Sequence, residues 1–302
     1  MMNYTKKLHT NFMLVLLILL SSIILYSCSS TRVSENESDP GQSLGIVSIP
    51  NLRDMGGYKT VDGATVARGL VYRSNQLYKI SAEDMLLLAN LNLKSDFDLR
   101  TASERNAKPD ELPVGVNDIW LDVLADDPNS GPANVISLIK DPKQANIKLG
   151  DGKVEEMFRE AYRQFISLPS AQLAFRKLFL SLGDENQVPA LFHCTTGKDQ
   201  TGWAAAALLT LVGVPKEVVI EDYLRSNDYI LPMYTTLIEG FVNAGGYPNI
   251  PVAILGVKEE YLNAAFDEMH TKYGRIENYF SEGLNINVDQ QAALRNMYLK
   301  NK

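Results

Sequence analysis

The chain has few residues that could bind a transition metal. Its 302 residues include two cysteines, at positions 28 and 194, and three histidines, at positions 9, 193 and 270. A structural zinc site needs about four cysteine or histidine ligands at characteristic spacings. Because these five residues are scattered along the sequence, we expect no metal site.

Basic residues are also in the minority. Lysine and arginine together number 29 against 36 aspartates and glutamates, and the formal net charge is −7. Nucleic acids and anionic lipid surfaces attract proteins chiefly through positive charge. We therefore expect no nucleic-acid partner, and an anion that binds this protein must be held by a local pocket.

The apolar runs are short. The run from Phe12 to Leu20 follows two lysines and is too short for a comfortable membrane span, but it fits the core of a secretion signal. It leads to Leu25-Tyr26-Ser27-Cys28, which resembles the cleavage box of bacterial lipoproteins. This pattern predicts a lipoprotein signal peptide over residues 1–27, with Cys28 as the acylated first residue of the mature chain.

A polar segment, residues 28–45, then separates the predicted anchor from the rest of the chain and is typical of a flexible tether. The protein would be held in the cell envelope, on the periplasmic or cell-surface face of a membrane, by the lipid at Cys28. With Cys28 acylated, no cysteine pair remains for a disulfide. Ordinary signal cleavage near Ser27 is the alternative.

The most informative stretch is residues 193–203, HCTTGKDQTGW. An apolar run, Val188 to Phe192, precedes it, and an alanine-rich run follows, so the pattern predicts a buried strand, a tight loop and a helix start. Backbone N–H groups of such a loop and the positive end of the helix dipole form an anion cradle. Cys194 stands at its mouth near Lys198, where the nucleophilic thiolate is favoured. A cysteine that merely fills space in the core is the alternative.

The sequence around Cys194 resembles the signature of cysteine-dependent protein-tyrosine phosphatases, in which five residues separate the cysteine from an arginine. It is most similar to the HCxxGKDRTG loop of the bacterial tyrosine/lipid phosphatases. Three further stretches resemble motifs of that family: NLRDMGG at residues 51–57, DLRTASER at residues 98–105 and the segment from Tyr273 to Leu284. One position departs, because Gln200 stands where the family has its phosphate-clamping arginine.

The resemblance implies an α/β fold with a central, mostly parallel sheet between helices. It implies a reaction in which Cys194 attacks a phosphomonoester and forms a thiophosphate that water hydrolyses, without metal or cofactor. Phosphorylated proteins or phospholipids would be the substrates. The roles that it implies are a thiolate-assisting hydroxyl at Thr201, a proton donor at Asp199 or else at Asp98, and substrate contacts at Thr195, Thr196, Gly197, Lys198, Gln200, Arg100 and Arg53.

Two of these assignments have structural alternatives. Arg53 and Asp54 could pair with each other to lock a loop, and Asp98 and Arg100 could form a structural salt bridge. Gln200 also leaves two functions open. Two lost charge-assisted hydrogen bonds correspond to about 3–6 kcal/mol, or roughly a hundredfold to ten-thousandfold in rate. The protein is therefore a slow phosphatase or, alternatively, a phosphate-binding pseudophosphatase.

Residues 46–302 are the predicted phosphatase-like domain. Within it, residues 124–168 form an insertion, irregular at first and then an amphipathic helix from Val154 to Leu168, which could be a lid or could pack permanently on the domain. Residues 58–73 predict a hairpin around Asp62-Gly63. Helices are predicted from residue 81, over residues 170–182, and in the C-terminal half near residues 233–243, 257–273 and 288–300.

Overall fold

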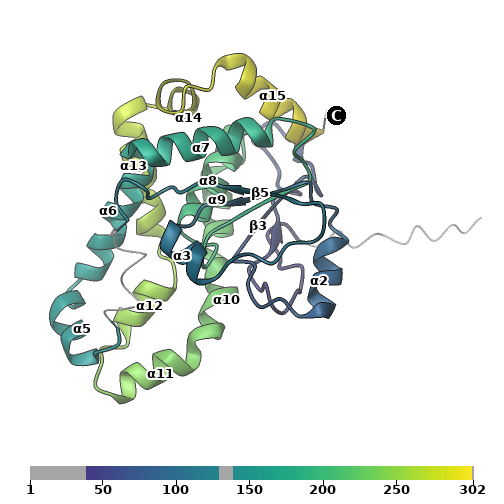
Figure 1. Ribbon diagram of the computed structural model, residues 1–302. Coiled ribbons are helices and arrows are strands. Elements are labelled where there is room, and N and C mark those ends of the chain that lie inside the picture. Colours follow the sequence, from purple (N-terminus) through teal and green to yellow (C-terminus); the bar gives the residue numbers. More distant parts are fainter. Residues whose placement is uncertain (1–38, 129–138, 301–302) are drawn as a thin grey trace, which may run out of the picture. The chain divides into compact units, whose positions relative to one another are not determined.

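The computed structural model describes residues 39–128 and 139–300 (Figure 1). The predicted signal peptide and Cys28 lie outside the described residues, as does part of the predicted insertion, residues 129–138. None of the helices in the described ranges is long and apolar enough to cross a membrane.

A five-stranded sheet forms the centre of the fold, in the order β1-β3-β6-β4-β5. The edge strand β1 runs antiparallel to β3, and all other neighbours are parallel. A separate antiparallel pair joins β2 to the C-terminal strand β7. The strands are β1 (Arg53–Asp54), β2 (Thr65–Val66), β3 (Val71–Ser74), β4 (Ser95–Asp98), β5 (Asn117–Trp120), β6 (Ala190–His193) and β7 (Leu299–Lys300).

Helices make up most of the remaining chain, with the largest group following β6. They are α2 (Ala82–Ala89), α3 (Ala102–Ala107), α5 (Pro142–Leu149), α6 (Lys153–Ser167), α7 (Pro169–Leu182), α8 (Gln200–Leu211), α9 (Lys216–Leu224), α10 (Ser226–Ile230), α11 (Thr235–Asn243), α12 (Asn249–Leu255), α13 (Glu259–Tyr273), α14 (Ile276–Asn278) and α15 (Val288–Tyr298). A 3₁₀ turn, η2 (Leu231–Tyr234), and a π turn, η3 (Tyr279–Gly283), complete them.

The strands present different side chains to two helical layers, as the alternation of a strand requires. Phe97 and Phe192 face the main core, which is shared with α6, α7, α8 and α13. Tyr72 and Leu191 face a smaller core that includes Leu88 of α2. The predicted α/β fold with a mostly parallel sheet between helices is confirmed.

The helix that follows the loop, α8, lies in the middle of the main core. All of its residues except Thr210 are buried. Its alanines allow close approach of neighbouring elements, and alanine is also the best helix former. A helix this deeply embedded gives the preceding loop a rigid support.

Most predicted helices are present, with shifts of a few residues at their ends. Ser81 caps α2 by accepting a hydrogen bond from the Asp84 N–H, and Thr101 and Glu104, which have the sequence pattern of a capping box, form one at the start of α3. The helices α5 and α12 were not predicted. The first begins with an Asp141 cap and a proline in its first turn. Both are short, and their sequences lack a regular apolar period.

The predicted hairpin over residues 58–73 forms only in its first part, where residues 57–60 pair with residues 64–66. The tight turn exists, since Lys59 bridges Thr65 and Gly63 has a φ of +84°. After this turn, residues 67–73 do not continue the hairpin. Residues 65–66 pair with the C-terminal strand β7, whereas β3 enters the central sheet between β1 and β6. Residues 65–66 therefore pair both with the local segment, since the Val66 N–H donates to the Tyr58 oxygen at 2.9 Å, and with β7, which lies more than 230 residues away in sequence.

The helix α6 of the predicted insertion is built into the domain. Phe158, Tyr162 and Phe165 are buried, and Phe158 stacks on Tyr261 of α13 with ring centroids 5.1 Å apart. This packing covers the apolar face that a moving lid would have to expose. A lid function for residues 124–168 stays a prediction.

Candidate active site

The loop after β6 adopts a conformation that only glycine permits at one point. Gly197 has a φ of +70°, in the left-handed region. A Cβ atom at this position would lie 2.3 Å from the carbonyl oxygen of Ser74 at the end of β3. The loop therefore packs backbone to backbone against the neighbouring strand, and Gly197 is required for both reasons.

The carbonyl groups of the loop are held on the side away from the site. The Arg73 guanidinium donates to the Gly197 oxygen at 2.8 Å. The Asn51 amide donates to the Thr196 oxygen at 3.0 Å and to the Gly197 oxygen at 3.2 Å. With its carbonyls bound in this way, the loop can turn its N–H groups toward an anion. Within residues 39–128 and 139–300, no hydrogen-bond acceptor is recorded for the N–H groups of residues 195–199.

Asp222 of α9 organises the arginines behind the loop. It accepts from Arg53 at 2.6 Å, from Arg73 at 2.7 Å and from the Tyr58 hydroxyl at 2.6 Å, and all four side chains are buried. Burial raises the pKa of Asp222, but Arg53 and Arg73 outweigh burial and lower that pKa below its ordinary value. The carboxylate is therefore a permanent counter-ion.

Arg53 belongs to this support and is absent from the residues that line the cavity at Cys194. It also donates to the Asp222 carbonyl at 2.9 Å and to Ser226 at 3.1 Å. The alternative pairing with Asp54 does not form, because Asp54 accepts from the N–H groups of Gly56 and Gly69. The geometry thus gives the predicted substrate contact of Arg53 no support and makes it a structural residue.

We expect Asp222→Asn to lower the free energy of unfolding by about 3 kcal/mol, because it leaves two buried guanidiniums without a counter-ion. Chemical denaturation of the wild type and the variant measures this difference. The same change at the exposed Asp228 is the control and should stay within about 0.5 kcal/mol. Equal changes in the free energy of unfolding at both positions would show that the ion pairs of Asp222 with Arg53 and Arg73 do not stabilise the fold.

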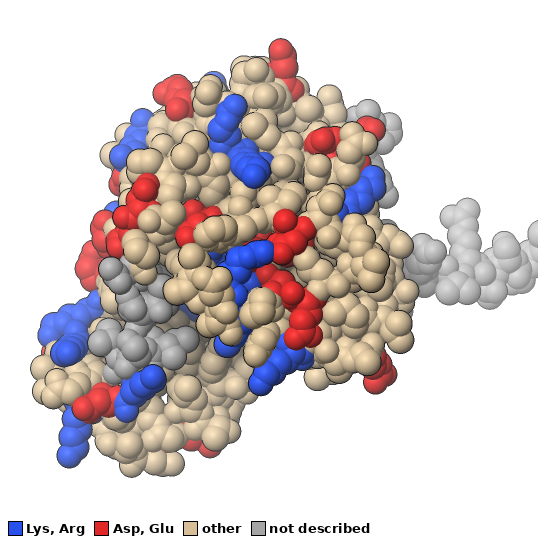
Figure 2. Space-filling model, in the orientation of Figure 1, with Lys and Arg blue, Asp and Glu red and all other residues tan. Residues whose placement is uncertain are grey.

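Asp98 and Arg100 form the structural salt bridge. Arg100 binds both oxygens of Asp98 at 2.8 Å and also donates to Asp110 at 2.5 Å. Arg105 adds a further ion pair to Asp98 at 2.8 Å. On this face of the molecule, which carries α3, acidic and basic side chains lie next to one another (Figure 2). The network ties the end of β4 to α3 and the segment after it.

This network argues against Asp98 as the proton donor. Burial raises its pKa, but Arg100 and His193 outweigh burial and hold the pKa far below its usual value. An ionised carboxylate with both oxygens bound has no proton to give. Neither Asp98 nor Arg100 lines the cavity at Cys194, so the geometry gives both predicted roles, acid and substrate contact, no support.

Asp96, Asp110 and His193 are three groups that could together hold a metal ion, since one ligand atom of each lies within 4.8 Å of the others. The imidazole Nε2 atom is 3.3 Å from Asp96 and 3.5 Å from Asp110. Burial lowers the pKa of His193, but the two carboxylates outweigh it and raise that pKa well above its usual value. Burial also raises the pKa of Asp96, so this cluster favours the retention of a proton.

A cavity of about 200 Å³ opens at the loop and contains most of the predicted site residues. Five loop positions and Cys194 contribute to its wall: Cys194, Thr195, Thr196, Lys198, Asp199 and Gln200. The rest of the wall was not predicted from the sequence and consists of Gln76, Glu104, Ala107, Lys108, Phe158, Ile254 and Leu255. Of these residues, only Glu104 had a sequence signal, its place in the capping box of α3. Glu104 also accepts a hydrogen bond from the Thr195 hydroxyl at 2.6 Å, which connects α3 to the loop.

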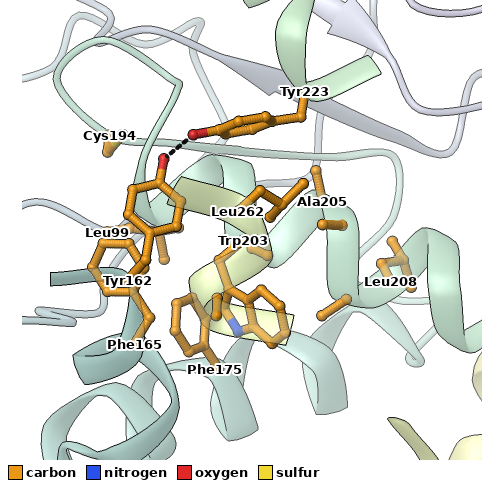
Figure 3. Close-up of a cluster of buried hydrophobic side chains, with 14 of the residues drawn as sticks. Leu99, Tyr162, Phe165, Phe175, Cys194, Trp203, Ala205, Leu208, Tyr223 and Leu262 are labelled. Carbon is orange, nitrogen blue, oxygen red and sulfur yellow. Dashed lines mark hydrogen bonds between the residues drawn. The ribbon is translucent and has the colours of Figure 1, made fainter. Parts of the chain in front are cut away.

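Asp199 and Lys198 are paired within the cavity wall. The Lys198 ammonium lies 3.0 Å from the Asp199 carboxylate and 4.8 Å from the centre of the Phe158 ring. The Tyr162 hydroxyl donates to Asp199 at 3.0 Å, and it bonds to the Tyr223 hydroxyl at 2.7 Å (Figure 3). Burial and Asp199 raise the pKa of Tyr162 well above its usual value. Tyr162 therefore stays a donor and fixes the carboxylate.

Gln200 and Thr201 are the first two residues of α8, and Thr201 does not line the cavity. The Thr201 hydroxyl is buried and has no hydrogen-bond partner in the part of the chain that the structure describes. Gln200 lines the cavity and is 5% exposed. Cys194 itself is 2% exposed and is a free thiol. The cavity wall thus contains the nucleophile, the Asp199 carboxylate and Gln200, and it does not include the predicted residues Thr201 and Gly197.

The comparisons with known proteins agree with this site. The model of a tyrosine phosphatase family matches residues 44–300. A Cupriavidus necator protein whose name designates it a tyrosine-protein phosphatase is 28% identical over 259 residues, which is 85% of this chain and 88% of that protein. The triple specificity protein phosphatase PtpB of Mycobacterium tuberculosis is 28% identical over 257 residues, 77% of this chain and 90% of that protein.

A more distant likeness is found among solved structures. TpbA of P. aeruginosa has a TM-score of 0.27 and 18% sequence identity, covering 67% of this chain and 90% of TpbA, which is too remote to carry an argument. The family match, in contrast, spans nearly all of the described residues and includes the loop, Cys194 and α8. The chain belongs to the tyrosine phosphatase family and is a phosphatase.

Proposed function

We propose that this phosphatase hydrolyses phosphomonoesters through a covalent intermediate on Cys194. The thiolate sulfur attacks phosphorus, an S–P bond forms, and the bond between phosphorus and the ester oxygen breaks. Water then attacks the thiophosphate and releases inorganic phosphate and the thiolate. The observation that carries the proposal is the position of Cys194 on the wall of the cavity, beneath a loop whose carbonyls are bound elsewhere.

Asp199 is the proposed acid for the leaving oxygen. It lines the cavity, and Tyr162 holds its orientation. A phosphate that enters the cavity would attract the Lys198 ammonium away from Asp199, because the dianion carries more charge than the carboxylate. Asp199 would then no longer be paired with Lys198 and would serve the leaving oxygen as the acid that this step needs.

Thr201 is proposed to assist the second step. Its buried hydroxyl is without a partner among the described residues. A hydrogen bond from it to the Cys194 sulfur would stabilise the thiolate as it leaves phosphorus. Removal of this hydroxyl should therefore slow the breakdown of the thiophosphate more than its formation.

Gln200 is proposed to make the enzyme slow. The loop N–H groups can still hold the phosphoryl oxygens, but glutamine offers a single neutral donor in place of two charged ones. Phosphotyrosine is the expected substrate from the family, and the name of PtpB, a triple specificity phosphatase, extends the candidates to other phosphomonoesters. These include phosphorylated proteins and phospholipids.

Hydrolysis of p-nitrophenyl phosphate by the purified protein, with vanadate titration alongside, tests this function. We expect slow release of phosphate that vanadate inhibits. If the protein binds vanadate but hydrolyses none of the phosphomonoesters offered, the proposal fails and the phosphate-binding alternative is correct.

We also propose that the protein is a lipoprotein anchored at Cys28, which rests on the lipobox-like sequence and the polar segment after it. Metabolic labelling with a fatty acid in a bacterial host should mark the wild type, and the label should disappear in Cys28→Ala. Equal labelling of Cys28→Ala would contradict the anchor.

A further inference from the structure

With Gln200 in place of the family's arginine, another cation would have to face the phosphate. Arg53 and Arg73 are bound to Asp222 behind the loop. Arg100 is bound to Asp98 and Asp110. Lys198 reaches the cavity, where it pairs with Asp199 at 3.0 Å and is proposed to move to the bound phosphate. The three arginines are therefore not free to replace the missing one, and Lys198 alone is a single point charge where arginine would give two charged donors.

Lys108 is a further cation on the wall of the same cavity. It follows α3 directly, at the C-cap of that helix, and its side chain is exposed. No ion pair of Lys108 is found in the described ranges, 39–128 and 139–300, whereas Glu104 on the same wall is already bound by Thr195 and Thr101. Lys108 thus brings a positive charge without an ion pair to the cavity that contains Cys194 and Gln200, while the Glu104 carboxylate keeps its negative charge because threonine hydroxyls do not neutralise it.

The backbone of Lys108 is fixed although its side chain is not. Its carbonyl oxygen accepts a hydrogen bond from Arg100 at 2.8 Å, and its N–H donates to the Glu104 oxygen at 3.1 Å. Arg100 in turn is locked by Asp98 and Asp110. The salt bridges of Arg100 therefore fix the backbone of Lys108 at the cavity, and its flexible side chain could extend toward a bound phosphate.

We propose that Lys108 contacts the phosphoryl oxygens and supplies the positive charge that arginine would give at position 200. This inference rests on the proposed phosphatase function and names a further residue for it. A lysine ammonium acts as a point charge and lacks the planar fork of arginine, so it restores part of the lost stabilisation. A contact from Lys108 would also explain why the loop has Cys194 and Asp199 but glutamine at position 200.

A double-mutant cycle on the full chain tests the proposal, with kcat/KM for p-nitrophenyl phosphate as the readout. In the wild-type background, Lys108→Ala should lower kcat/KM by about thirtyfold, since it removes the charged donor. In the Gln200→Arg background the same change should lower it less than about threefold, because arginine already fills the role. Lys108→Arg should retain most of the activity, and Lys143→Ala, an exposed lysine on α5, is the matched control.

Two results would overturn the proposal while the phosphatase function stands. One is a wild-type enzyme with Cys194-dependent turnover in which Lys108→Ala changes kcat/KM by less than about threefold. The other is an equal loss in both backgrounds, which would indicate a general structural effect. If the wild type hydrolyses no p-nitrophenyl phosphate, the phosphatase function fails. The vanadate affinity of the Lys108→Ala variant then tests whether Lys108 contacts the bound anion. About tenfold weaker binding to Lys108→Ala supports the contact, and unchanged binding excludes it.

Discussion

Cys194→Ser is expected to reduce phosphatase activity by about ten-thousandfold or more, because a serine hydroxyl in this loop has no base to activate it. The substitution replaces one small buried side chain by another of nearly the same shape, so the fold should survive. Vanadate should still bind, since the loop N–H groups do not depend on the sulfur. The measurement is kcat/KM for p-nitrophenyl phosphate together with the melting temperature.

Thr195→Ser is the matched control for this variant. It changes the next residue of the loop and keeps the hydroxyl that donates to Glu104. Its activity should stay within about threefold of the wild type. If Cys194→Ser keeps most of the activity while remaining folded, the nucleophile is not Cys194 and the proposed reaction is wrong.

Gln200→Arg is expected to raise kcat/KM by about tenfold to a thousandfold, which is part of what two charge-assisted hydrogen bonds provide. The space for the longer side chain exists, because Gln200 already lines the cavity. Its position as the first residue of α8 also directs an arginine toward the loop. Vanadate affinity should increase less than the rate, because the arginine fork fits the transition state best.

The stability of Gln200→Arg should remain within about 0.5 kcal/mol of the wild type, because the change faces a cavity and not the core. Gln144→Arg, on the exposed face of α5, is the control for the added charge and should leave the rate unchanged. A Gln200→Arg variant that gains nothing, in a wild type that already depends on Cys194, would mean that another cation fills the gap completely.

The loop could be predicted because the relevant signals are local. Strand, cysteine, glycine and helix start follow one another within residues 188–212, whereas Asn51 and Arg73, which hold the loop carbonyls, are remote in sequence. The capping box of Thr101 and Glu104 was predictable for the same reason. The α/β fold, with a mostly parallel sheet between helices, was implied by the resemblance to the phosphatase family.

The arginines could not be assigned from the sequence because their partners are remote. Arg53 and its counter-ion Asp222 are 169 residues apart, and no local pattern marks Asp222 as their meeting point. Lys108 was missed for a different reason. Its importance depends on the cavity wall and on the pairing of Lys198 with Asp199, and both are visible only when the tertiary contacts are known.

The most direct measurement of the Cys194 mechanism is to trap the intermediate. The wild type and a Thr201→Ala variant, in which thiophosphate breakdown should be slower, are mixed with substrate, quenched and digested, and the peptide that contains Cys194 is analysed by mass spectrometry. We expect one added phosphoryl group on Cys194, more in Thr201→Ala, and none on this peptide from Cys194→Ser. Active enzyme with no phosphoryl group on Cys194 in either preparation would contradict the mechanism.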